Sequence, residues 1–201
     1  MASVKQAQTL LQKYFGYNKF RPNQEAIIDD LLSKKDVVGI MPTGGGKSLC
    51  FQLPALMLPG TAIVISPLIS LMKDQVDALK ANGIDAGFYN SSQSADVKNK
   101  IIRGLHKNSL QLLYMAPESL DVLLPHLKED KVSLFAIDEA HCISAWGHDF
   151  RPAYIQLGKL KHQFPATPIA AFTATADAAT QDDIIHQLNI PEATKHIASF
   201  D

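Results

Sequence analysis

Short, continuously apolar segments alternate along this chain with longer segments of helical character, and this alternation constrains the fold most. Segments rich in Val, Ile, Leu and Phe predict strands at residues 37–41, 62–66, 86–89, 110–115, 133–137 and 169–173. The segments that follow them predict helices at 48–58, 68–82, 94–106, 117–127, 153–162 and 178–188. Strands that are apolar at successive positions are buried on both faces. We therefore expect an α/β fold with a central, mostly parallel sheet and helices on both faces, and ligands beyond the carboxyl ends of the strands.

Composition narrows the classes of protein that fit this pattern. The 201 residues are 46% hydrophobic and 19% charged, which suits one folded domain. The formal net charge of −1 disfavours nucleic-acid binding by bulk charge. A protein with this net charge can still have a local basic groove. Two cysteines, Cys50 and Cys142, form neither a disulfide framework nor a zinc ligand set. With no signal-peptide core and no apolar run of about 20 residues, we expect a cytoplasmic protein without a membrane partner.

A glycine-rich loop follows the first predicted strand and opens a helix. Its residues are Thr43, Gly44, Gly45, Gly46, Lys47 and Ser48. Consecutive glycines let backbone N–H groups turn toward a phosphate, and the helix N-terminus adds partial positive charge. We expect Lys47 to reach the terminal phosphates and the Ser48 hydroxyl to ligate Mg²⁺. Met41 stands where the strict motif has glycine, and the alternative is a glycine-rich turn that binds nothing.

Two acidic residues, Asp138 and Glu139, end the predicted strand at 133–137. Acids at the end of an apolar strand cost folding energy unless a cation or a functional water compensates them. Asp138 suits a Mg²⁺ ligand and Glu139 suits the general base that activates water, with Lys47 completing the catalytic set. The alternative is a solvated turn. The second acid also weakens the GTPase and simple-kinase interpretations.

Together these motifs resemble the RecQ family of superfamily-two DNA helicases. The resemblance rests on GGGKS at 44–48, DEAH at 138–141, FGYNKFRPNQ at 15–24, SPLISLMKDQ at 66–75, CISAWGHDFRP at 142–152 and FTATA at 172–176. It implies that residues 1–201 form one ATP-binding, RecA-like first lobe using ATP and Mg²⁺, in which residues 1–35 are a helical adenine-recognition segment. Family members continue into a second RecA-like lobe, a zinc-binding region and usually a winged helix, which we expect to be absent here.

The adenine site is expected at Gln24, Arg21 and Tyr17. The Gln24 amide presents both a donor and an acceptor to a base edge. Arg21 or Tyr17 offers a planar face for stacking on the base. From the residues alone, a helix-capping segment and ordinary core aromatics explain the pattern as well, and the resemblance favours the adenine site.

DNA contact and its coupling to hydrolysis are expected in segments that follow other strands. The resemblance implies these roles for Ser66, Trp146, His148, Phe150, Arg151, Thr173 and Thr175. Aromatic side chains stack on unpaired bases of any sequence. The alternatives are an ordinary helix start after Ser66 and a satellite hydrophobic cluster beneath the aromatic loop. His141 is either a bridge toward the segment at 172–176 or a core histidine.

Other polar residues predict no site. His106, His126, His162, His186 and His196 lack metal-ligand spacing or an evident acidic partner, and we expect them at the surface or at helix ends. The pair Lys34–Lys35 and residues 159–161 are expected on solvated faces.

The leading hypothesis is the ATP-binding lobe of an ATP-dependent DNA helicase that couples hydrolysis to strand separation in recombination and repair. The alternatives are a nucleotide-binding module inactive without the second lobe, and an RNA helicase lobe, which the Trp146 loop disfavours. Expected partners are single-stranded DNA and duplex junctions, and the second lobe of the same chain in the full-length enzyme. The isolated lobe is expected to be a monomer, associated with the nucleoid if the source is bacterial.

Overall fold

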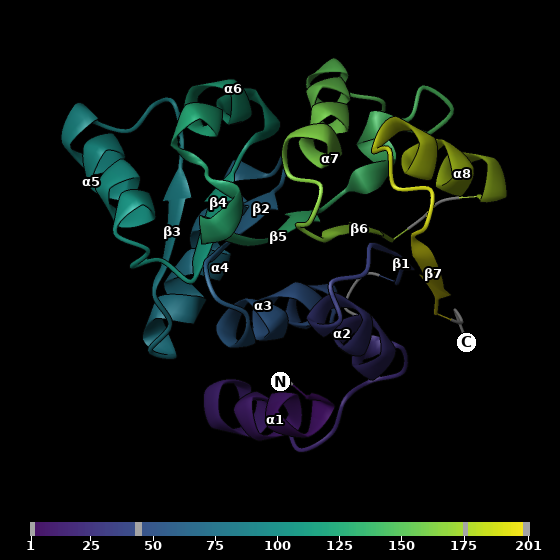
Figure 1. Ribbon diagram of the computed structural model, residues 1–201, viewed down its shortest axis with the longest axis horizontal. Helices are drawn as coiled ribbons and strands as arrows, with labels where there is room; N and C mark the ends of the chain where they lie inside the picture. The colour runs from purple at the N-terminus through teal and green to yellow at the C-terminus, as the bar shows by residue number, and fades with distance from the viewer. Residues whose placement is uncertain (1–2, 43–45, 175–176, 199–201) are drawn as a thin grey trace.

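The computed structural model describes residues 3–42, 46–174 and 177–198 and contains a seven-stranded sheet (Figure 1). Its strands are β1 (Val37–Ile40), β2 (Thr61–Ile65), β3 (Ala86–Tyr89), β4 (Leu112–Met115), β5 (Val132–Ile137), β6 (Ile169–Thr173) and β7 (Thr194–Ile197). They lie in the order β3-β4-β2-β5-β6-β1-β7, and each described pair is parallel. The predicted α/β class and the six predicted strands are confirmed.

Strand β7 is the element that the apolar pattern missed. It is the edge strand beside β1, and three of its four residues are exposed. An edge strand that buries little apolar surface needs no continuous apolar run, so its Thr-Lys-His-Ile sequence carries no strand signal of that kind.

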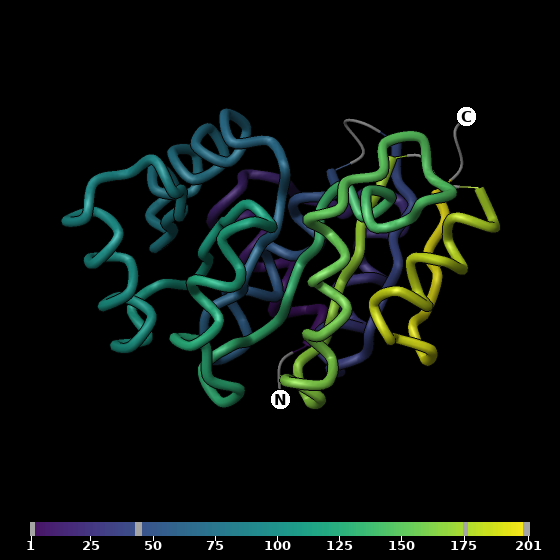
Figure 2. Tube along the Cα trace, turned by 90° about the horizontal axis from the view of Figure 1, so that it is seen from above, coloured from purple at the N-terminus to yellow at the C-terminus, as the bar shows by residue number. Residues whose placement is uncertain are grey.

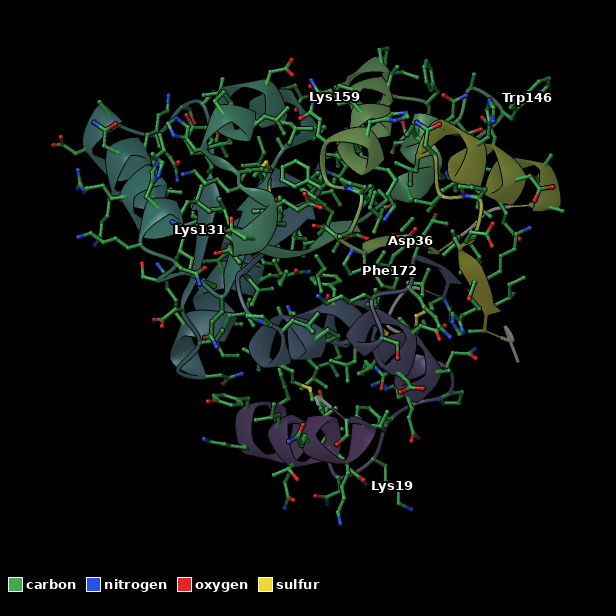
Figure 3. The ribbon with its side chains drawn as sticks, in the orientation of Figure 1. Lys19, Asp36, Lys131, Trp146, Lys159 and Phe172 are labelled. Atoms are coloured by element: carbon green, nitrogen blue, oxygen red, sulfur yellow. The ribbon has the colours of Figure 1, made fainter. Side chains whose placement is uncertain are left out.

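Helices cover both faces of the sheet (Figure 1). The predicted helices after β1, β2, β3 and β6 are present as α3 (Lys47–Met57), α4 (Ile69–Ala81), α5 (Ala95–His106) and α8 (Ala178–Gln187). One buried apolar cluster fills the space between the sheet and α3 and α4, and Phe172 points into it (Figure 3). A second cluster lies on the opposite face, toward α8.

Two predicted helices were wrong as continuous elements. The segment 117–127 is divided into a 3-10 turn (Pro117–Ser119), α6 (Leu120–Leu123) and a second 3-10 turn (Leu124–His126). Pro125 lacks the N–H that an α-helix would need there. The segment 153–162 falls in a 3-10 helix (Pro152–Lys159) followed by α7 (Leu160–Gln163). Gly158 lies within that stretch, and glycine is a poor helix former.

An additional helical layer precedes β1. It consists of α1 (Val4–Leu10), a π-helical turn (Leu11–Phe15) and α2 (Gln24–Leu32). Ser3 caps α1 by accepting from the Gln6 N–H at 3.3 Å. Helix α1 lies outermost, and a small cluster that includes Leu11, Ile28 and Leu53 joins this layer to α3 (Figure 1). The N-terminal segment therefore packs directly on the helix that follows the glycine-rich loop.

Two side chains expected on solvated surfaces have buried partners instead. Lys161 pairs with Asp36 at 2.9 Å, with 19% and 12% of the side chains exposed. Asp36 also accepts from the Ile169 N–H at 2.8 Å, so it ties β6 to the start of β1 (Figure 3). His196 lies 2.7 Å from the carboxylate of Asp30 and joins β7 to α2. The expectation was wrong because these partners are remote in sequence.

Among the described residues, no helix combines the length and the apolarity needed to cross a bilayer.

Candidate active site

The carboxyl ends of the central strands bring the predicted catalytic segments to one edge of the sheet. Met41, just after β1, donates its N–H to the Thr173 carbonyl of β6 at 3.0 Å. Asp138, just after β5, donates its N–H to the Ile65 carbonyl of β2 at 2.9 Å. Thr43, Gly44 and Gly45 lie outside the described residues, as does Thr175, whereas Gly46, Lys47 and Ser48 are described.

Lys47 and Asp138 form the centre of the site. The Lys47 Nζ lies 3.7 Å from the Asp138 Oδ1, and 16% and 13% of these side chains are exposed. The Glu139 N–H donates to the same Oδ1 at 3.0 Å. Burial raises the pKa of Asp138, and the Lys47 cation opposes that rise only in part. A buried carboxylate with this environment is suited to a second cation.

The residues present fit a Mg²⁺ ion as the resemblance implies. Hard divalent cations prefer oxygen ligands, and the Asp138 carboxylate and the half-buried Ser48 hydroxyl are of that kind. The Ser48 Oγ accepts a hydrogen bond from the Gln75 amide at 3.4 Å. One lone pair of the hydroxyl oxygen then remains for a metal ion.

Glu139 is held beside His141 and Thr173. Its backbone has φ 52° and ψ 44°, a left-handed conformation that few non-glycine residues adopt. The Glu139 Oε2 lies 3.6 Å from the His141 Nδ1. The same Nδ1 lies 2.6 Å from the Thr173 Oγ1. Of the two interpretations of His141, the structure supports the bridge, since the imidazole joins the acids after β5 to the end of β6.

The His141 imidazole also contacts the aromatic loop, residues 142–151. His148 stacks on it with ring centroids 4.5 Å apart and an interplanar angle of 14°. Burial lowers the pKa of His141, and the neighbouring His148 lowers it further. His141 is therefore uncharged at neutral pH, and it lies between His148 of the loop, on which it stacks, and the Glu139 carboxylate.

The remaining loop side chains extend away from the acids. Trp146 is 78% exposed and lies at the periphery of the molecule (Figure 3). Phe150 is 40% exposed. Arg151 forms an ion pair with Asp149 at 3.2 Å. The exposure of Trp146 disagrees with a buried satellite cluster and leaves its indole face available for a ligand.

The predicted adenine residues line one pocket of about 410 Å³ that opens beside the phosphate loop. Gln24 is 1% exposed and spans the pocket wall. Its Oε1 accepts from the Arg21 N–H at 2.7 Å, and its Nε2 donates to the Gly46 carbonyl at 3.0 Å. These contacts use one amide hydrogen and one oxygen lone pair of Gln24, and the predicted adenine contact would need the other two. Tyr17, which is 52% exposed, lies at the rim.

Ser66 shows the ordinary geometry of a helix start. Its side chain is buried, and its hydroxyl accepts from the Leu68 N–H at 3.3 Å, just before α4 begins. This contact orients the first turn of α4. It also occupies the Leu68 N–H, one of the backbone donors to which a DNA phosphate would bind.

Sequence reasoning missed several residues of the site. Phe15, Lys19 and Gln52 also line the pocket that contains Gln24. Gln75 donates a hydrogen bond to the Ser48 hydroxyl. It lies in the segment 66–75, which supports the resemblance to RecQ helicases but predicted no residue of the nucleotide site. Tyr154 is fully buried and donates its hydroxyl to the Asp138 carbonyl at 2.9 Å, and the local sequence carries no signal for that contact.

Comparison with known proteins defines the class to which this site belongs. The sequence profile of the family described as DEAD/DEAH box helicase matches residues 21–184. The chain belongs to the DEAD/DEAH box helicase family.

Within that class, the resemblance to RecQ helicases is confirmed. The chain is 52% identical over 197 residues to the ATP-dependent DNA helicase RecQ of Haemophilus influenzae, covering 97% of this chain and 32% of the relative. It is 51% identical over 198 residues to the ATP-dependent DNA helicase RecQ of Bacillus subtilis, covering 96% of this chain and 34% of the relative. The chain therefore spans about a third of the length of these relatives.

Solved helicase structures share the fold. The DUF1998 helicase MrfA bound to DNA matches with a TM-score of 0.75 and 17% identity, covering 98% of this chain and 28% of that one. A hypothetical ATP-dependent RNA helicase from Sulfolobus tokodaii matches with a TM-score of 0.72 and 19% identity, covering 97% and 56%. These matches support the RecA-like architecture predicted for the lobe.

Proposed function

We propose that this chain is the ATP-binding lobe of an ATP-dependent DNA helicase. The observation that carries the proposal is the buried Lys47–Asp138 pair beside Glu139, in which Lys47 also lines the pocket that contains Gln24. About half of the aligned residues are identical to those of relatives named ATP-dependent DNA helicase RecQ. This similarity supports ATP as the nucleotide and DNA as the polymer.

Each residue of the site has a chemical task in this proposal. Lys47 places a positive charge where the terminal phosphates bind, and Glu139 accepts a proton from the attacking water. Asp138 and Ser48 would hold Mg²⁺, which when bound neutralises charge on the β- and γ-phosphate oxygens. The uncharged His141 orients the Glu139 carboxylate without forming a competing full charge beside it.

Gln24 ties adenine recognition to the phosphate loop. Because its amide already bonds to the Gly46 carbonyl, a base that engages the same amide meets a group held in place by the loop. Adenine offers an exocyclic N–H donor and a ring nitrogen acceptor on one edge, which the remaining Gln24 groups complement. The proposal therefore includes a preference for adenine over guanine nucleotides.

Nucleotide titration of the 201-residue chain tests the binding site. A fluorescent ATP analogue with Mg²⁺ should bind, unlabelled ATP should compete better than GTP, and Lys47→Ala should abolish binding. Lys5→Ala removes an exposed lysine on α1 and is the matched control. Equal competition by ATP and GTP would remove adenine recognition from the proposal, and unaltered binding by Lys47→Ala would remove the phosphate site.

A second candidate, a module that binds nucleotide without turning it over alone, follows from the share of the relatives that the chain spans. In related enzymes an arginine from elsewhere stabilises charge at the γ-phosphate, and its loss costs about 10³–10⁵ in rate. We therefore propose that the isolated lobe has negligible DNA-stimulated hydrolysis. Strong stimulation of the 201-residue chain by single-stranded DNA would contradict this.

The proposed roles of Glu139 and of the aromatic loop must be tested in an enzyme that includes the second lobe. There, Glu139→Gln should retain ATP binding and lose turnover, while Glu192→Gln, at an exposed position, should change neither. Trp146→Ala and Arg151→Ala should depress DNA-stimulated hydrolysis far more than nucleotide binding. Stimulation by RNA in place of DNA would favour the RNA helicase alternative.

A further inference from the structure

Three side chains of different metal-binding chemistry lie together at the aromatic loop. The ligand atoms of His141, Cys142 and Asp149 all lie within 4.8 Å of one another. His141 and Cys142 are buried, whereas 47% of the Asp149 side chain is exposed. The loop is the green segment beside the yellow helix α8 in Figure 2, and the Ser144 hydroxyl donates to Asp183 of that helix at 2.6 Å. Neither Cys142 nor Asp149 has a task in the proposed nucleotide site.

The chemistry of these three ligands favours Zn²⁺ over the hard cations. Thiolate sulfur, imidazole nitrogen and carboxylate oxygen are the ligands that Zn²⁺ takes in proteins, whereas Mg²⁺ and Ca²⁺ prefer oxygen ligands alone. Cys50, the other thiol, lies elsewhere, 3.7 Å from the Gly46 carbonyl. The two cysteines therefore predict no zinc site from the sequence, and the structure adds an imidazole and a carboxylate to one of them.

Hydrogen bonds hold the two buried ligands in place. The Cys142 N–H donates to the Glu139 carbonyl at 3.0 Å, and the Cys142 carbonyl accepts from the Arg151 N–H at 2.9 Å. The His141 Nδ1 lies 2.6 Å from the Thr173 Oγ1, which leaves Nε2 as the nitrogen for a metal ion. A histidine that binds a metal ion usually donates its other N–H to an oxygen, and this contact fixes the ring. His141 has such a contact.

The partly exposed Asp149 side chain can make the adjustment that tight coordination needs. Ligand atoms on one tetrahedral Zn²⁺ lie about 3.3–3.6 Å apart. The Cys142 Sγ and the Asp149 Oδ2 lie 4.0 Å apart. Asp149 also pairs with Arg151 at 3.2 Å, with 47% and 43% of these side chains exposed. An ion pair that exposed contributes little free energy, so a metal ion can displace it.

We propose that His141, Cys142 and Asp149 form a Zn²⁺ site that joins the two ends of the aromatic loop. The His141 Nε2, the Cys142 Sγ and one Asp149 oxygen would bind the ion, with water at the fourth position. On binding, the Cys142 thiol releases its proton to solvent and Asp149 separates from Arg151. An occupied site would restrain the loop beside Glu139, a consequence that rests on the proposed function, whereas metal binding itself does not depend on it.

Co²⁺ is a direct probe of this site, because a thiolate bound to Co²⁺ gives a charge-transfer absorption band in the near ultraviolet. The reduced 201-residue chain, in excess Mg²⁺ and without nucleotide, should give this band with a single Co²⁺, and Zn²⁺ should remove it. Cys142→Ala should lack the band, and the matched variant Cys50→Ala should keep it. Trp146, the one tryptophan of the chain, lies in the loop, and Co²⁺ should quench its fluorescence over the same titration.

Asp149→Asn tests the third ligand at a side chain exposed enough for the fold to tolerate the change. Co²⁺ should bind this variant at least about ten-fold more weakly. Asp182→Asn removes a carboxylate from another exposed ion pair, with Lys195 at 2.7 Å, and should leave Co²⁺ binding unchanged. Lys47→Ala should keep the band, so that failure of the nucleotide site and failure of the zinc site are distinguishable.

Three results would each overturn the proposal. They are the absence of a thiolate band in the unmodified chain, a band that persists in Cys142→Ala, and unaltered Co²⁺ binding by Asp149→Asn. Any of them would leave the cluster as a buried thiol hydrogen-bonded to a carboxylate.

Discussion

Replacing Gly46 by alanine tests how tightly the N-terminal segment that contains Gln24 is joined to the glycine-rich loop. Gly46 has φ +79°, and a Cβ built on it would lie 2.2 Å from the Gln24 Nε2. That nitrogen donates to the Gly46 carbonyl at 3.0 Å. The added methyl group would therefore displace the Gln24 amide and break the hydrogen bond that joins the two segments.

The expected cost has two parts. A non-glycine residue in the left-handed region costs about 1–2 kcal/mol. The lost hydrogen bond costs a further ~0.5–1.5 kcal/mol. Gly83→Ala is the matched control, because Gly83 has φ +84° and a Cβ there would meet nothing within 4 Å. The control should lose only the backbone part of the free energy of unfolding.

Urea unfolding of Gly46→Ala, Gly83→Ala, Gln24→Ala and the double variant Gly46→Ala/Gln24→Ala measures the cost of the lost hydrogen bond. Removing the Gln24 side chain relieves the clash, so the double variant should be more stable than the sum of the single losses by about 1 kcal/mol. Titration with a fluorescent ATP analogue should show weaker binding by Gly46→Ala and unaltered binding by Gly83→Ala. Equal losses in the two glycine variants, with additive behaviour toward Gln24→Ala, would refute the reasoning.

Three other substitutions or modifications have expected outcomes. Gly39→Ala should lower the free energy of unfolding in urea by about 1–3 kcal/mol, because its Cβ would lie 2.9 Å from the buried Phe172 ring. Asp138→Asn should stabilise the Mg²⁺-free protein, because burial raises the pKa of Asp138 and the charged form therefore destabilises the fold. The gain in the free energy of unfolding, measured in urea, should be absent below the ordinary Asp pKa of 3.8, grow above it, and become constant above the raised pKa. Burial raises the pKa of Cys50 and of Cys142 to about 12, so neither thiol should react with iodoacetamide at pH 8 before unfolding, as mass spectrometry would show.

The central sheet was predictable because its strands are buried on both faces. Continuous apolar runs such as that of β5 have no other favourable environment in a protein of this size. The same rule placed Lys47 and Asp138 at the same edge of the sheet, and the structure has them 3.7 Å apart although β6 lies between β1 and β5. Strand β7 escaped the rule because it lies at an edge and buries little apolar surface.

Contacts between residues remote in sequence were not predictable in this way. The motifs indicated that Gln24 and Ser48 belong to one site, but not that Gln24 bonds to the Gly46 carbonyl or that Gln75 bonds to Ser48. Such contacts depend on the angle at which α2 and α4 pack on the sheet. Periodicity and spacing define which face of a helix is buried, and they leave that angle open.

The bridge from the aromatic loop to Glu139 is constrained by the charge state of His141. An uncharged imidazole carries one N–H, and the Nδ1 faces both the Glu139 carboxylate, at 3.6 Å, and the Thr173 hydroxyl, at 2.6 Å. A bare nitrogen lone pair facing a carboxylate would be repelled, so the hydrogen belongs on Nδ1. His141 then donates to the Thr173 hydroxyl, with the Glu139 carboxylate 3.6 Å away, while its ring face stacks on His148. A ligand that moves His148 would shift this donor and change how Glu139 is oriented toward water. Acidification through the lowered pKa of His141 would place a positive charge 3.6 Å from the Glu139 carboxylate, so the uncharged form of this bridge exists only above that pKa.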